Sequence, residues 1–246
     1  MEALRSLISV SGISVILTMA SLEISLSNDA ASPVPILVSL DSDEGIARLN
    51  ESECSGDFFR LVRFFCPQKN LAFCGVASSV MILNALPIRK PQGGVHGSFP
   101  FYTQENYFSA EARAIKPPEE VAESGMSLVE LTSILNTHPE VRAECCFAST
   151  ISLFDFRELA ITHLNSDKSY VLVNYLRTGL GQQGGGHISP IGAYHQKSDS
   201  FLIMDVSQYK YPPVWVAAKA LWQSMFEKVE GSELSRGFVL VRTTQS

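Results

Sequence analysis

The first half of the chain carries apolar patterns that predict helices. Residues 74–86, CGVASSVMILNAL, are apolar on nearly every face, which is typical of a helix buried in a core. Residues 127–136 begin with a capping-box pattern, Ser127 followed by Glu130, and the same spacing recurs at Ser152 before the run FDFRELAITHL. We therefore expect helices at all three places.

The second half changes to the shorter period of strands. Four apolar runs, separated by glycine-rich or charged turns, predict strands at 170–176, 187–194, 201–206 and 237–242. A helical segment is expected at 216–228, between the last two strands. Helices first and strands later are typical of an α+β protein, unlike the regular alternation of an α/β protein. We expect a helical lobe packed on an antiparallel β lobe, with a cleft between them.

The N-terminus differs from the rest of the chain. Arg5 precedes an uncharged, largely apolar run from Leu7 to Ala20, which is short for a membrane span but suits the core of a secretory signal. We interpret residues 1–25 as a signal peptide, which predicts export, to the periplasm in a bacterium. The alternative is a buried N-terminal strand or helix in a cytoplasmic protein. Residues 26–246 are expected to form a single two-lobed domain, and no later stretch resembles a membrane span.

Composition limits the partners. Hydrophobic residues make up 46% of the chain and charged residues 18%, which is ordinary for a folded protein. A formal net charge of -6 gives no general electrostatic reason to bind nucleic acid or an anionic membrane. The ligand is therefore expected to be small, or to be recognised by local chemistry. The sequence leaves the oligomeric state open, with a homodimer among the options.

Five cysteines raise the question of disulfides and metals. They stand at positions 54, 66, 74, 145 and 146, without a CxxC pair. An odd number leaves at least one thiol free or paired with another chain. Adjacent Cys145 and Cys146 would strain a mutual bridge, so ordinary burial is expected there. Because no spacing matches a known zinc class, we assign no metal site.

Cys74 stands where a helix can activate it. The unpaired backbone N–H groups and the positive dipole of a first helical turn favour thiolate over thiol. Gln68, six residues upstream, is close enough for a loop to bring its side-chain amide beside the sulfur. Together with the backbone N–H of Cys74, that amide would bind the oxyanion formed when a thiolate attacks a carbonyl.

Among the five histidines, His187 is best placed to serve as the base. GQQGGGHISPIGAY leads from a triple glycine through His187 into an apolar strand. Asp205 follows four apolar residues of the next strand, where a carboxylate needs a buried partner. An antiparallel hairpin of the two strands brings Asp205 near His187. Cysteine, then histidine, then an orienting acid is the chain order of the papain-like arrangement.

Three local stretches are more specific than this spacing. NLAFCGVASSVMILNAL, GGGHISPIGAY and MDVSQYKYPPVWV together resemble the catalytic domain of phytochelatin synthases, the γ-glutamylcysteine dipeptidyltranspeptidases. The resemblance runs from about Asp57 to Arg242. It is greatest to the short bacterial members, because the cysteine-rich C-terminal region of the plant enzymes is absent.

The resemblance implies a fold, a reaction and a set of residues. In that family a papain-like domain attacks the Cys–Gly bond of glutathione, releases glycine and holds γ-Glu-Cys as a thioester, which water or a second glutathione then accepts. Cys74 would be the nucleophile, His187 the base and later acid, Asp205 the orienter and Gln68 the oxyanion donor. The positions that would hold the γ-glutamyl portion are Asn174, Arg177, Gly186 and Arg236.

One departure from related sequences concerns the second glutathione, which would accept the acyl group. They commonly carry arginine where DVSQYKYPP has Gln208, which favours hydrolysis over transfer to a second glutathione. The resemblance requires no resident cofactor. It allows stimulation by a heavy-metal ion such as Cd²⁺ or Zn²⁺, or a metal–glutathione thiolate as the substrate.

Two other functions remain open at this point. A papain-like peptidase that trims double-glycine leader peptides would also show Gln, Cys-Gly, His and Asp, but gives no role to SPIGAY or YKYPPVW. A non-catalytic extracytoplasmic protein that binds thiols or metals would keep the fold and lose turnover. The intact set of Gln68, Cys74, His187 and Asp205 argues against this last reading.

Overall fold

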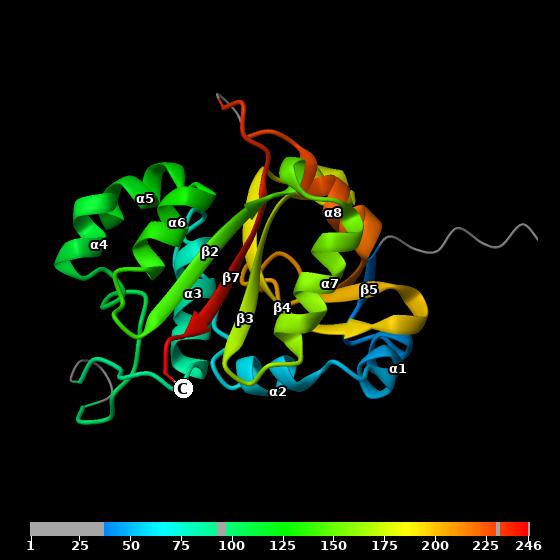
Figure 1. Ribbon diagram of the computed structural model, residues 1–246, viewed down its shortest axis with the longest axis horizontal. Coiled ribbons are helices and arrows are strands. Elements are labelled where there is room, and N and C mark those ends of the chain that lie inside the picture. The colour runs from blue at the N-terminus through cyan, green and yellow to red at the C-terminus, as the bar shows by residue number, and fades with distance from the viewer. Residues whose placement is uncertain (1–36, 93–96, 230–231, 246) are drawn as a thin grey trace, which may run out of the picture. The chain divides into compact units, whose positions relative to one another are not determined.

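The centre of the fold is an antiparallel sheet (Figure 1). The computed structural model describes residues 37–92, 97–229 and 232–245, so the proposed signal peptide lies outside the described residues. Within them the sheet has seven strands in the order β1-β6-β5-β4-β3-β7-β2, each antiparallel to its neighbours. The strands are β1 Leu37–Ser39, β2 Val141–Phe147, β3 Ser169–Leu176, β4 Gly186–His195, β5 Ser200–Ile203, β6 Val214–Ala217 and β7 Gly237–Thr243.

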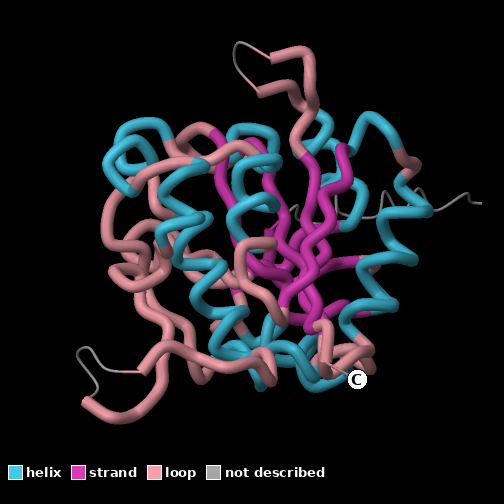
Figure 2. Tube along the Cα trace, turned by 60° about the vertical axis from the view of Figure 1, so that its left-hand side comes forward, coloured by secondary structure: helices cyan, strands magenta, loops and turns pink. Residues whose placement is uncertain are grey.

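Helices cover the two faces of this sheet. Helix α3 and the α4–α6 group lie on one side, and α7 and α8 lie on the other (Figures 1 and 2). The mixture of helices with an antiparallel sheet confirms the predicted α+β class. The helices are α1 Asp43–Glu51, α2 Gly56–Val62, α3 Cys74–Ala85, α4 Ala110–Ile115, α5 Pro118–Ser124, α6 Leu128–Leu135, α7 Leu153–Leu164 and α8 Ala218–Phe226.

The middle strands are buried on both faces, which explains their continuous apolar runs. In β3, Tyr170 and Leu172 join the core under α3, whereas Val171 and Val173 join the core under α7 and α8. The same alternation divides the side chains of β7 between the two cores. Because side chains alternate across a strand, Asn174 falls on the α3 side of the sheet.

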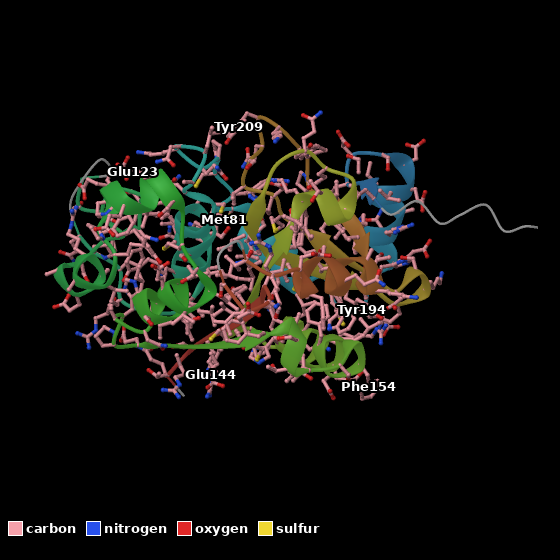
Figure 3. The ribbon with its side chains drawn as sticks, turned by 90° about the horizontal axis from the view of Figure 1, so that it is seen from above. Met81, Glu123, Glu144, Phe154, Tyr194 and Tyr209 are labelled. Atoms are coloured by element: carbon pink, nitrogen blue, oxygen red, sulfur yellow. The ribbon has the colours of Figure 1, made fainter. Side chains whose placement is uncertain are left out.

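Helix α3 is the buried element that the sequence predicts. Its residues from Cys74 to Asn84 are all buried, and Ser78 Oγ donates a hydrogen bond to the Ile188 carbonyl of β4 at 3.0 Å. In Figure 3, Met81 marks α3 in the interior, between the helix that carries Glu123 and the sheet. This packing fixes the first turn of α3 against the start of β4.

Other predicted elements agree with the structure to different degrees. Capping boxes begin α6 at Ser127 and α7 at Ser152, as predicted. The strand expected at 201–206 was too long, because β5 ends at Ile203. The helix expected at 216–228 is also shorter in the structure. Strand β6 pairs with β1 as far as Val216 and with β5 as far as Ala217, and α8 begins only after it.

Neither the strand β2 nor the short elements before α3 was predicted from the sequence. Among the described residues, no helix has the length and apolarity that a membrane crossing requires.

Candidate active site

Cys74 opens α3 at the floor of a pocket of about 750 Å³. One wall of the pocket is formed by residues 122–127, which comprise the end of α5 and the turn that leads into α6. The opposite wall comes from β3, the start of β4 and Arg236 just before β7. The predicted cleft between helices and sheet is therefore present, with the cysteine at its base.

His187 and Asp205 meet beside this cysteine, as the hairpin predicts. Strands β4 and β5 pair antiparallel, and His187 Nε2 lies 2.8 Å from Asp205 Oδ1. Ser189 Oγ lies 2.9 Å from the same ring nitrogen. These two contacts leave Nδ1 as the nitrogen for the hydrogen bond between His187 and Cys74. All three groups are at least nine-tenths buried.

The electrostatics of the site favour an ion pair of thiolate and imidazolium. Burial raises the pKa of the Cys74 thiol, but the hydrogen bond and charge of His187 and the backbone N–H groups of Ile188 and Gly75 outweigh it, so the net pKa is lowered. Burial likewise lowers the pKa of His187, but Asp205 and Cys74 outweigh it and raise the net pKa. The two shifts act in the same direction, because each favours the charged form of the group.

Arg177 occupies a different place from the one expected of it. Its guanidinium is 4% exposed and does not line the pocket. Instead it makes two parallel contacts to Asp205, Nη1–Oδ2 at 2.8 Å and Nη2–Oδ1 at 3.0 Å. Although burial raises the pKa of Asp205, His187 and Arg177 hold it well below its usual range. Arg177 therefore orients and ionises the acid rather than facing a substrate.

Arg177 is itself enclosed by two neighbouring segments. Its Nη1 also donates to Gln182 Oε1 at 2.7 Å, and its guanidinium lies over the Tyr211 ring at 4.9 Å. Tyr211 accepts a hydrogen bond from the Gln183 backbone at 2.7 Å. Tyr211, in the motif YKYPPVW, thus packs against the arginine of the buried ion pair. The roles of Gln182 and Tyr211 were missed, because nothing in their local sequence points to Arg177.

Gln68, six residues before α3, is bonded to residues 206 and 207, which directly follow Asp205. Its Nε2 donates to the Asn70 carbonyl at 2.7 Å, and its Oε1 accepts from Ser207 Oγ at 2.9 Å. Its backbone N–H also donates to the Val206 carbonyl at 3.0 Å. Gln68 is not among the residues that line the pocket, and the bond to Asn70 uses only one of the two hydrogens of its amide group.

The other three residues expected to hold substrate line the pocket together. Asn174, Gly186 and Arg236 all belong to its sheet-side wall. Arg236 Nη1 lies 3.4 Å from Asn174 Oδ1, and Arg236 Nε is buried without a hydrogen-bond partner. This half-buried guanidinium is incompletely satisfied, in contrast to Arg177. A bound carboxylate would complete its hydrogen bonding.

The remaining predictions concern thiols, metals and the acceptor. All five cysteines are free thiols. Among the residues that the structure describes, no group of three or more His, Cys, Asp or Glu side chains could hold a metal ion. Gln208 is exposed and does not belong to the pocket wall, and Tyr209 beside it is 58% exposed and lies at the surface (Figure 3).

Comparison with known proteins assigns the chain to a family. A sequence model described as phytochelatin synthase matches residues 30–238. The chain is 34% identical over 212 residues to glutathione gamma-glutamylcysteinyltransferase 1 of Lotus japonicus, which covers 85% of this chain and 41% of the relative. Identity to the enzyme of the same name in Arabidopsis thaliana is 32% over 212 residues, covering 85% of this chain and 42% of that relative.

A fungal relative matches over a similar length of the chain. Identity to the glutathione gamma-glutamylcysteinyltransferase of Schizosaccharomyces pombe is 30% over 203 residues, or 82% of this chain and 47% of that protein. The chain thus spans less than half the length of these relatives. It belongs to the phytochelatin synthase family.

Proposed function

We propose that this protein cleaves the Cys–Gly bond of glutathione through a thioester on Cys74, in a papain-like site. One observation carries the proposal: Cys74, whose pKa His187 lowers, shares a pocket with the guanidinium of Arg236, whose Nε lacks a hydrogen-bond partner. Glutathione presents a carbonyl to attack and, at the far end of its γ-glutamyl group, a free carboxylate for an arginine. The names of the family's relatives support the same substrate.

The first half of the reaction forms the acyl-enzyme. The Cys74 thiolate attacks the cysteinyl carbonyl, and the oxyanion is held by the Cys74 backbone N–H and the Gln68 amide. The tetrahedral intermediate collapses with cleavage of the C–N bond, while His187 donates its proton to the departing glycine amine. Asp205 keeps the imidazole oriented and stabilises its charged form.

The second half releases the acyl group. His187, now neutral, accepts a proton from water, or from the amine of a second glutathione, as that nucleophile attacks the thioester. Water gives γ-Glu-Cys, and the amine gives (γ-Glu-Cys)₂-Gly. Because Gln208 carries no charge to hold an acceptor carboxylate, we propose that hydrolysis is the main route. Export of the chain is also part of the proposal and rests on the sequence of residues 1–25 alone.

Heavy metals enter the proposal as part of the substrate. Cd²⁺ or Zn²⁺ would arrive as a thiolate of glutathione and would need no resident site. A homodimer is compatible with the proposal and is not required by it.

The test is an incubation of the purified chain with glutathione, with products resolved by mass spectrometry. We expect glycine in an amount equal to the sum of γ-Glu-Cys and the longer peptide, with γ-Glu-Cys the larger of the two. We expect none of these products from Cys74→Ser. Unchanged glutathione together with cleavage of a double-glycine leader peptide would contradict the proposal and favour the leader-peptidase function.

A further inference from the structure

A buried glutamine outside the pocket holds the loop that carries Gln68. Gln104 is 6% exposed and lies in the segment between α3 and α4. Its Nε2 donates to the Pro67 carbonyl at 2.9 Å, and its Oε1 accepts from the Lys69 backbone N–H at 3.0 Å. One side chain thus bonds the backbone on both sides of Gln68.

This arrangement restricts the loop much as a neighbouring strand would. An amide side chain carries an NH₂ donor group and a carbonyl acceptor in a single plane, and here the two bond to backbone groups of residues two apart. Gln68 is held from the other side by Val206 and Ser207, which follow Asp205 directly. Without Gln104, the direction of the Gln68 amide would be set by its bonds to Val206, Ser207 and Asn70.

Gln104 is in turn tied to the helix that carries the nucleophile. Asn84, in the last turn of α3, donates to the Tyr102 carbonyl and accepts from the Tyr102 backbone N–H, both at 2.9 Å. Tyr102 stands two residues before Gln104. Both proposed donors to the oxyanion are therefore positioned by α3. The Cys74 backbone N–H belongs to its first residue, and the Gln68 loop is connected to its last turn through the side chains of Gln104 and Asn84.

We propose that Gln104 is a positioning residue that sets the placement of the Gln68 amide for the oxyanion. The inference rests on the proposed function in one respect, because it takes Gln68 to be the oxyanion donor. Gln104 itself touches no substrate. A purely structural role would lower stability without a specific effect on the step that Gln68 serves.

Three variants separate these roles. Gln104→Met keeps the side-chain length and removes both hydrogen bonds. Gln104→Glu retains both bonds while its carboxyl group is protonated, since a neutral acid can donate to Pro67 and accept from Lys69, and loses the donor when it ionises. Asn136→Leu is the matched control. The Asn136 side chain makes the same kind of paired hydrogen bonds to the backbone N–H and carbonyl of Ala143, at 2.8 and 2.9 Å, on the edge strand β2.

The measurements are kcat and KM for glycine release, with thermal unfolding of each variant. We expect Gln104→Met to lower kcat at least tenfold with KM changed less than threefold, since loss of an oxyanion donor costs about 10²- to 10³-fold. Gln104→Glu should recover most of kcat at low pH relative to wild type at the same pH and lose it as pH rises. Asn136→Leu should melt earlier and keep wild-type kcat.

A double variant shows whether Gln104 acts through Gln68. In a Gln68→Ala background, we expect Gln104→Met to change kcat less than twofold, because the group it positions is gone. Equal losses in both backgrounds, or a wild-type kcat in Gln104→Met, would overturn the inference while leaving the proposed function in place. A wild-type kcat in Gln68→Ala would instead overturn the oxyanion assignment, and this inference with it.

Discussion

Adding one methyl group at Gly186 should displace the arginine that we assign to the substrate carboxylate. A Cβ atom there would lie 2.3 Å from Arg236 Nη1 and 2.9 Å from Arg236 Cζ. Ordinary contacts of this kind need about 3.5 Å, so the guanidinium must retreat by about 1 Å. Gly186 does not have a positive φ, and alanine therefore fits its backbone. The damage should fall on Arg236.

The expected magnitude follows from the bond that the displacement removes. A hydrogen bond to a charged group contributes about 1.5–3 kcal/mol, and each 1.4 kcal/mol is a factor of about ten in binding. Arg236 Nη1 already lies 3.4 Å from Asn174 Oδ1, so a retreat away from the pocket also breaks this contact. We expect Gly186→Ala to lower kcat/KM for glutathione by roughly 10- to 100-fold, mainly through KM.

The assay is steady-state release of glycine, and the neighbouring glycine supplies the control. A Cβ atom at Gly185 meets nothing within 4 Å, and Gly185 also lacks a positive φ. Gly185→Ala should therefore behave as wild type. Alkylation of Cys74 by iodoacetamide needs no carboxylate site, and its rate should be the same in both variants. A Gly186→Ala enzyme with kcat/KM within twofold of wild type would refute the assignment of Arg236.

The ion pair should also appear in the pH dependence: kcat/KM should rise as pH passes the lowered pKa of Cys74 and fall as pH passes the raised pKa of His187, giving a plateau between them. Asp205→Asn should lower the pKa of His187 and so move the alkaline end of the plateau to lower pH. A pH profile unchanged by this variant would contradict the role of Asp205. Arg177→Met should lower the free energy of unfolding by about 3 kcal/mol, measured by urea denaturation, because it leaves the buried Asp205 carboxylate with His187 as its remaining charged partner. A stable variant with a raised KM would place Arg177 at the substrate instead. Gln208→Arg should raise the share of (γ-Glu-Cys)₂-Gly at high glutathione without changing the first release of glycine, and an unchanged product ratio would show that the acceptor is held elsewhere.

The helix that begins at Cys74 and the hairpin that carries His187 could be predicted from the sequence because each has a local signal. The all-round apolar run after Cys74 requires burial on every face, and Asp205 at the end of an apolar strand requires a buried partner. Strand pairing then leaves few places for that partner other than His187. Local patterns combined with simple topology were sufficient to predict that these three residues lie together.

Other features depend on contacts between distant segments. The two arginines offered the same local signal, and only the fold shows that Arg177 is neutralised by Asp205 while Arg236 is not. Gln104 is separated from the loop it holds by 35 to 37 positions, and its surroundings in sequence resemble an ordinary polar loop. The helix predicted at 216–228 takes in the last two residues of β6, because the sequence does not show that β6 pairs with β1 and β5.

The most direct test of the proposed reaction is the mass of the intact protein after rapid mixing with glutathione and acid quenching. The thioester mechanism predicts a mass increase of one γ-glutamylcysteinyl group, located on Cys74 by peptide mapping and removed by neutral hydroxylamine. Cys74→Ala should show neither the adduct nor glycine release, while Cys66→Ala should retain both. Glycine released by Cys74→Ala, or an adduct located on another cysteine, would contradict the account.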